Sequence, residues 1–182
     1  MSIPKVLTIA GTDPSGGAGI MADLKAFGAL CTHGCAVVTA VVAQNTRGVA
    51  AVTQMTPQQV RTQLENLVDD VRIDALKIGM LGSPDTIHTV ATAMKDLAPR
   101  HLVLDPVLIC KGQEPGAALD AWRERLVAAW TGVIERGLPE PGDHRFYFDR
   151  GDETLDQFYA VFQTQVDQTF GRRGYGAGDF RS

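Results

Sequence analysis

Short apolar runs alternate with longer amphipathic segments over the first two thirds of this chain. Buried strands give short, continuous apolar runs, whereas helices that cover a sheet repeat their apolar residues every three or four positions. The alternation therefore predicts an α/β fold with a largely parallel sheet. The runs predict strands at residues 5–11, 36–43, 49–55, 75–81 and 101–107, and the amphipathic segments predict helices at 17–30, 57–71 and 83–97.

Two of the predicted helices begin with the same local signal, a hydroxyl residue followed by proline. Thr56-Pro57 and Ser83-Pro84 each offer a side-chain acceptor at the N-cap position and a proline at the first helical position. We therefore expect Thr56 to cap the helix that begins at Pro57.

Beyond residue 107 the pattern changes. A loop containing Gly and Pro at 111–116 is followed by one long predicted helix at 117–136. A second Pro/Gly stretch leads to an aromatic strand at 145–148 and then to a helix at 153–172, with a frayed tail at 174–182. The last third of the chain is thus organised differently from the rest.

Charge and composition narrow the classes of partner. The 182 residues include 17 Lys and Arg against 21 Asp and Glu, a formal net charge of −4, which disfavours nucleic-acid binding. The apolar stretch 36–43 is far shorter than the roughly 20 residues that a membrane helix needs. The start of the chain lacks the pattern of an export signal, so we expect a cytoplasmic protein. Cys31 and Cys35 have no second pair of ligands elsewhere, which argues against a zinc site there.

The glycine-rich stretch 11–19 lies between a predicted strand and a predicted helix. Ligands of open α/β sheets bind at the carboxyl ends of the strands, where this loop must lie. A Walker A loop would need a lysine at position 17, which is glycine. A dinucleotide fingerprint matches 17–22, but residues 36–43 hold no acidic ribose ligand. The loop is therefore a candidate ligand cradle that fits neither motif.

Several blocks of sequence, in order, resemble the hydroxymethylpyrimidine/phosphomethylpyrimidine kinase family of thiamine biosynthesis. The resemblance covers about residues 1–118 and implies a ribokinase-like, three-layer α/β/α fold with a mostly parallel sheet. It also implies transfer of the γ-phosphoryl group of ATP to a pyrimidine alcohol, with Mg²⁺ as cofactor and a homodimer as a possible assembly. The related pyridoxal kinases share the architecture and are the nearest alternative. The blocks are LTIAGTDPSGGAGI at 7–20, ADLK at 22–25, VAQNTRG at 42–48, VRID at 71–74, KIGML at 77–81 and VLDPV at 103–107.

The resemblance also implies site residues. A carboxylate at Asp23 and an amide at Gln44 can read the polar edge of an aminopyrimidine, while Met80 and Val107 supply apolar walls. Taken singly, Asp23 would only favour the dipole of its helix, and Met80 would be a core residue. Asp105 falls near the family's magnesium and phosphates. The implied pyrimidine pocket consists of Gly11, Asp23, Gln44, Met80 and Val107.

Beyond residue 118 the resemblance ends. The sequence contains none of the family's Asn-and-Glu segment, Lys-Gly-Gly stretch or Gly-Thr-Gly-Cys loop, so we expect impaired kinase activity. Residues 143–151 weakly resemble the C-terminal part of a bacterial α/β-hydrolase esterase, which makes residues 119–182 a possible fusion. His144 is expected in an exposed loop before the strand. The alternatives are a chimera that binds ligand without catalysis, and a hydrolase, for which the Gly-x-Ser-x-Gly turn is absent.

Overall fold

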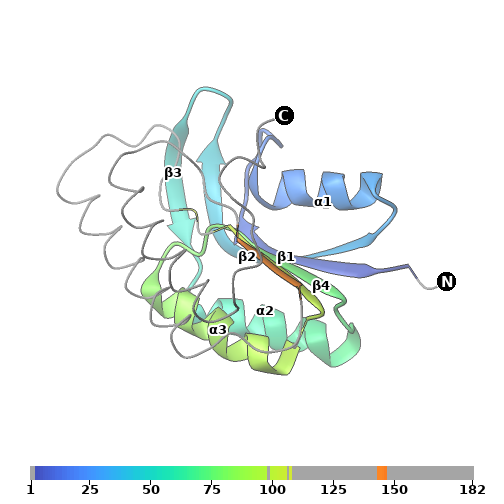
Figure 1. Ribbon diagram of the computed structural model, residues 1–182. Coiled ribbons are helices and arrows are strands. Elements are labelled where there is room, and N and C mark those ends of the chain that lie inside the picture. Colours follow the sequence, from blue (N-terminus) through green and yellow to red (C-terminus); the bar gives the residue numbers. More distant parts are fainter. Residues whose placement is uncertain (1–2, 98, 106, 108–142, 147–182) are drawn as a thin grey trace.

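The computed structural model describes residues 3–97, 99–105, 107 and 143–146, and their strands form one sheet in the order β3-β2-β1-β4-β5-β6 (Figure 1). Neighbouring strands are parallel except β2 and β3, which are antiparallel. The mostly parallel sheet is therefore confirmed. The strands are β1 Lys5–Gly11, β2 His33–Gln44, β3 Val49–Gln54, β4 Ala75–Ile78, β5 His101–Leu104 and β6 Asp143–Phe146; the helices are α1 Gly19–Ala29, α2 Pro57–Asp70 and α3 Pro84–Leu97.

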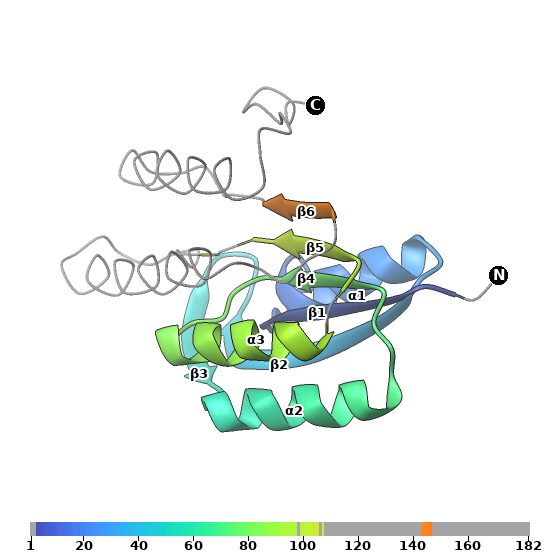
Figure 2. The same cartoon turned by 60° about the horizontal axis from the view of Figure 1, so that its bottom comes forward.

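The helices form layers on both faces of the sheet. Helix α1 covers one face, over β1 and β2, while α2 and α3 lie side by side on the opposite face (Figures 1 and 2). This arrangement confirms the predicted three-layer α/β/α architecture. Within the described part of the chain, no helix is long and apolar enough to cross a membrane.

The hydrophobic core lies between the sheet and the α2/α3 layer. Because side chains alternate along a strand, the inner positions of β1 and β4 carry large aliphatic residues and the positions between them face α1. Thr8 and Lys77 are register partners on β1 and β4, and both lie on the α1 face. The hydrophobic core thus lies on the α2/α3 face of the sheet, whereas Thr8 and Lys77 place polar groups on the α1 face. Its largest members are Leu7, Ile9, Leu64, Leu76, Ile78, Ile87, Met94, Leu102 and Leu104.

Helix α2 begins with a complete capping box. The Thr56 hydroxyl accepts a hydrogen bond from the Gln59 N–H at 3.2 Å, and the Gln59 side chain accepts one from the Thr56 N–H at 2.8 Å. The expected cap at Thr56 is confirmed, because both donors at this helix start are satisfied.

Thr56→Ala is expected to lower the free energy of unfolding by about 1 kcal/mol, because the Gln59 N–H loses its acceptor. Urea denaturation followed by circular dichroism measures the change. Thr56→Ser is the matched control; it keeps the hydroxyl and should cost less than about half as much. Equal losses in the two variants would contradict the assigned role of the cap.

Most predicted elements are confirmed, with shifted ends. Helix α1 begins at Gly19, two residues later than predicted, because the N–H groups of Gly17 and Ala18 donate to the Asp13 carboxylate. The predicted strand at 36–43 begins earlier, at His33, where β2 pairs with the start of β1. The predicted elements at 111–116, 117–136 and 153–172 and the tail at 174–182 lie outside the described residues.

The placement of His144 before a strand is wrong. Residue 144 lies inside β6, where it is the register partner of Leu102 on β5. The strand begins at Asp143, two residues earlier than predicted, since pairing with β5 extends over 143–146. A strand from the last third of the chain thus continues the sheet. The origin of that segment by fusion remains a prediction.

Candidate functional site

The loop between β1 and α1 is organised by one buried carboxylate. Asp13 is 2% exposed. Its Oδ1 accepts hydrogen bonds from the Ser15 N–H at 2.9 Å and the Ser15 hydroxyl at 2.7 Å. Its Oδ2 accepts them from the Ala18 and Gly17 N–H groups at 2.8 and 3.2 Å. The loop therefore wraps around the Asp13 carboxylate, and each of its two oxygens accepts two hydrogen bonds from the loop.

These hydrogen bonds lower the pKa of Asp13 from 3.8 to about 2. The Ser15 hydroxyl makes the largest contribution, and the Gln44 side chain and the N–H groups of Ser15 and Ala18 add to it. Burial acts in the opposite direction but is outweighed, because each of these donors stabilises the ionised form. Asp13 is therefore ionised at neutral pH and serves the loop itself, while Gln44 joins the end of β2 to it.

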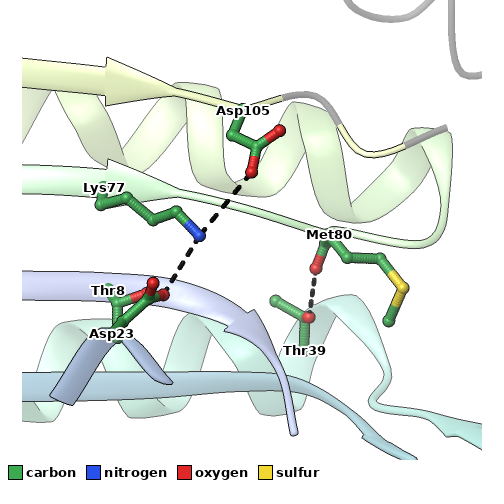
Figure 3. Close-up of polar contacts among 6 residues, drawn as sticks. All are labelled: Thr8, Asp23, Thr39, Lys77, Met80 and Asp105. Carbon is green, nitrogen blue, oxygen red and sulfur yellow. Dashed lines mark hydrogen bonds and ion pairs between the residues drawn. The ribbon is translucent and has the colours of Figure 1, made fainter. Parts of the chain in front are cut away.

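The carboxyl ends of β1, β2 and β4 are tied together at this loop. The Thr12 N–H donates to the Ala40 carbonyl at 2.9 Å, and the Thr12 hydroxyl accepts from the Val42 N–H at 2.9 Å. The Thr39 hydroxyl donates to the Met80 carbonyl at 2.6 Å (Figure 3). Three strand ends are thus fixed relative to one another.

Gly11 and Met80 are in direct contact. A Cβ atom on Gly11 would lie 2.6 Å from the terminal methyl group of Met80, which shows that this methyl group packs onto the Gly11 backbone. Glycine at position 11 is what permits so close an approach between the end of β1 and the Met80 side chain.

A charged cluster lies on the α1 face of the sheet, beside this edge. The Asp23 carboxylate, from α1, accepts the Thr8 hydroxyl at 2.6 Å and the Lys77 ammonium at 3.1 Å, both on Oδ2. The Lys77 ammonium also lies 3.9 Å from Asp105 Oδ2, beyond the end of β5 (Figure 3). The side chains of Asp23, Lys77 and Asp105 are 17%, 20% and 30% exposed, so solvent reaches them only in part.

We call these residues the carboxyl-edge site, and they fall into two groups. Gly11 and Met80 touch each other, and Gln44 joins the same loop through Asp13. Asp23 and Asp105 meet around Lys77. Val107 is placed next to Asp105, since its N–H donates to the Asp105 carbonyl at 2.8 Å. The site comprises Thr8, Gly11, Asp13, Asp23, Gln44, Lys77, Met80, Asp105 and Val107.

Sequence reasoning missed Asp13, Thr8 and Lys77. Asp13 stands two residues before Ser15 in an Asp-Pro-Ser-Gly stretch, a composition that favours a side-chain-capped turn. Lys77 interrupts an otherwise apolar run at 75–81, and a lone ammonium in a buried strand needs a partner. The sequence thus marks both residues as unusual, but it does not show which residues Asp13 and Lys77 contact.

The described residues supply only part of a magnesium shell. Within 3–97, 99–105, 107 and 143–146, no group of three or more His, Cys, Asp or Glu side chains could hold a metal ion. Asp105 offers one carboxylate, and the Lys77 ammonium already lies 3.9 Å from it. Mg²⁺ commonly takes one or two carboxylates and completes its shell with water and substrate phosphates. Asp105 alone is compatible with that pattern but does not define a site.

Comparison with solved structures places the architecture among the ribokinase-like vitamin kinases. The phosphomethylpyrimidine kinase of Clostridium difficile 630 has a TM-score of 0.63 and 32% identity, covering 90% of this chain and 71% of that one. The pyridoxal kinase of Staphylococcus aureus in complex with AMP-PCP has a TM-score of 0.65 and 26% identity, covering 91% and 60%. The same kinase has also been solved with pyridoxal and with ADP.

Sequence comparison identifies the family. The family model described as phosphomethylpyrimidine kinase matches residues 13–131. The hydroxymethylpyrimidine/phosphomethylpyrimidine kinase of Escherichia coli K12 is 48% identical over 137 residues, which are 74% of this chain and 51% of that protein. This chain belongs to the phosphomethylpyrimidine kinase family, which confirms the resemblance seen in the sequence. It spans about half the length of the curated relatives it matches.

Proposed function

We propose that the protein binds a hydroxymethylpyrimidine with an exocyclic amino group at the carboxyl-edge site and presents its alcohol to ATP for phosphorylation. The observation that carries the proposal is the convergence of Gly11, Met80 and Gln44 on one loop, at the same edge of the sheet as the group formed by Asp23, Lys77 and Asp105. An apolar wall next to a carboxylate and an amide suits a flat ring with polar edges. The names of the family relatives support a hydroxymethylpyrimidine as that ring.

The proposed roles follow from the chemistry of each side chain. Asp23 accepts an N–H from the exocyclic amino group, because an ionised carboxylate has only acceptors to offer. Gln44 can both donate to a ring nitrogen and accept an N–H. Met80 and Val107 pack against the ring faces. Asp105 would supply one ligand to Mg²⁺, whose charge would stabilise the phosphates of bound ATP.

We further propose that this chain is a weak catalyst when it acts alone. Phosphoryl transfer depends on positioning and on donors that stabilise charge on the moving group. The sequence has no Gly-Thr-Gly-Cys loop, and the loss of even one such donor lowers rates by roughly 10²–10³-fold. A coupled assay for ADP with hydroxymethylpyrimidine and Mg·ATP tests this part. Turnover equal to that of a full-length relative would overturn it.

Ligand binding is tested separately, by calorimetric titration of the full chain with hydroxymethylpyrimidine. Asp23→Asn is expected to weaken binding at least tenfold, because one acceptor of the carboxylate is exchanged for a donor. Asp85→Asn, at an exposed position in the first turn of α3, is the matched control and should bind as the wild type does. Absence of binding in the wild type would refute the proposed function.

Pyridoxal is the second candidate acceptor, because pyridoxal kinases are among the structural relatives. The two ligands are distinguished by the shift in melting temperature that each produces. A ligand at a hundredfold excess over its Kd stabilises the folded state by about 2.7 kcal/mol. We expect the aminopyrimidine to give the larger shift at equal concentration, and a larger shift with pyridoxal would reverse the assignment.

A further inference from the structure

Lys77 occupies a position where a lysine is unexpected. It lies in β4 between Leu76 and Ile78, which are 1% and 0% exposed and belong to the core. Its side chain leaves the opposite face of the sheet, beside its register partner Thr8. A Cβ atom on Gly79 would lie 3.0 Å from the Lys77 ammonium, so the glycine leaves space in which that ammonium sits. The absence of a side chain at Gly79 therefore makes room for the Lys77 ammonium on this face of β4.

The cation is directed at one particular oxygen. Both Lys77 and Thr8 donate to Oδ2 of Asp23, and no described residue donates to Oδ1. Asp13 provides the contrast, because four hydrogen bonds within its own loop use both of its oxygens. A carboxylate with a purely structural role is expected to have both oxygens hydrogen-bonded within the protein, as Asp13 has. Asp23 is anchored through one oxygen, which leaves the other as an acceptor for a ligand.

We propose that Lys77, together with Thr8, is a positioning residue that fixes Asp23 so that its Oδ1 selects ligands carrying an N–H donor. The inference rests on the proposed function, since it assumes that the ring lies against Asp23. Charge supports it: the ammonium 3.1 Å away balances the carboxylate, which suits the site to a neutral donor rather than a cation. Asp105, 3.9 Å from the same ammonium, holds Lys77 from the other side.

Selectivity is the measurement that separates positioning from a purely structural role. Calorimetric titration of the full chain compares two probes: hydroxymethylpyrimidine with its exocyclic amino group, and the analogue in which hydrogen replaces that group. We expect the wild type to prefer the amino compound at least tenfold. Lys77→Met should reduce this preference to within about threefold, because an unanchored carboxylate no longer presents Oδ1 in one place. Lys77→Arg, which keeps a cationic donor, should restore most of it.

Two further variants keep the test decisive. Lys5→Met makes the same side-chain change at the start of β1, outside the cluster, and should keep the wild-type preference. If Lys77→Met does not melt cooperatively, Thr8→Val replaces it in the test. This variant removes the hydrogen bond from the Thr8 hydroxyl to Asp23 Oδ2 without changing the charge, and it should lower the preference for the amino compound severalfold. A Lys77→Met or Thr8→Val protein that is folded and keeps the full preference would overturn the inference. A wild type that binds neither probe would instead refute the proposed function.

Discussion

Replacing Gly19 by alanine is expected to destabilise the fold by about 3 kcal/mol or more, since two separate costs fall on one position. The φ angle of Gly19 is +55°, where a side chain is strained by roughly 1–3 kcal/mol. An added Cβ would also lie less than 3.0 Å from the Gly11 carbonyl oxygen, a backbone atom of β1 that cannot swing aside. Forced overpacking of this kind typically costs another 1–3 kcal/mol. Urea unfolding measures the loss.

Gly28→Ala is the matched control in the same helix. A Cβ atom there would meet nothing within 4 Å, and Gly28 is not among the glycines with a positive φ. Alanine is the better helix former, so this variant should be as stable as the wild type or gain up to about 1 kcal/mol. Similar losses of stability in the two variants would contradict the close approach of Gly19 to the Gly11 carbonyl oxygen.

Asp13→Asn is expected to cost about 2–3 kcal/mol and to abolish ligand binding. The substituted amide keeps only one acceptor oxygen, so either the Ser15 donors or the N–H groups of Gly17 and Ala18 lose their partner, and the loop that follows Gly11 loosens. Denaturant unfolding and calorimetric titration with hydroxymethylpyrimidine read the two effects. Asp69→Asn, at an exposed position of α2, is the control and should change neither.

The same substitution has a signature in pH. The pKa of Asp13 is about 2 in the folded protein and 3.8 in the absence of the fold, so ionisation stabilises the folded state above pH 3.8. That contribution, on the order of 2 kcal/mol, is lost as the pH falls from about 4 towards 2. The wild type should therefore lose this much more stability than Asp13→Asn over the interval. Parallel stability curves for the two proteins would contradict the low pKa.

The elements of the fold were predictable because their signals are local. The apolar run 5–11 coincides with β1, and the Thr56-Pro57 pair marks the start of α2. The end of β1 next to a glycine-rich loop likewise located one half of the site, because ligands of parallel sheets lie at that edge. Only the family resemblance predicted Gln44 and Met80 as site residues, because no property of these residues alone would have distinguished them.

The charged cluster could not be predicted in the same way, because it depends on pairings between distant segments. Asp23 and Lys77 are 54 positions apart and meet only when α1 packs over β1 and β4 in the observed register. The position of residue 144 inside β6 depends on strand pairing too, since β5 lies some forty residues earlier in the chain. Local composition around 138–143 favoured a turn, and pairing with β5 extended the strand backwards.

Alternation along β4 has a consequence for how such a protein can change. Leu76 and Ile78 pack in the hydrophobic core, whereas the side chain of Lys77 between them lies on the opposite face of the sheet and takes no part in that core. Mutation can therefore change the side chains on the α1 face of the strand while the hydrophobic core on the other face stays intact. A one-residue insertion within β4 has no such tolerance, because it would turn the ammonium inward and an aliphatic chain towards Asp23.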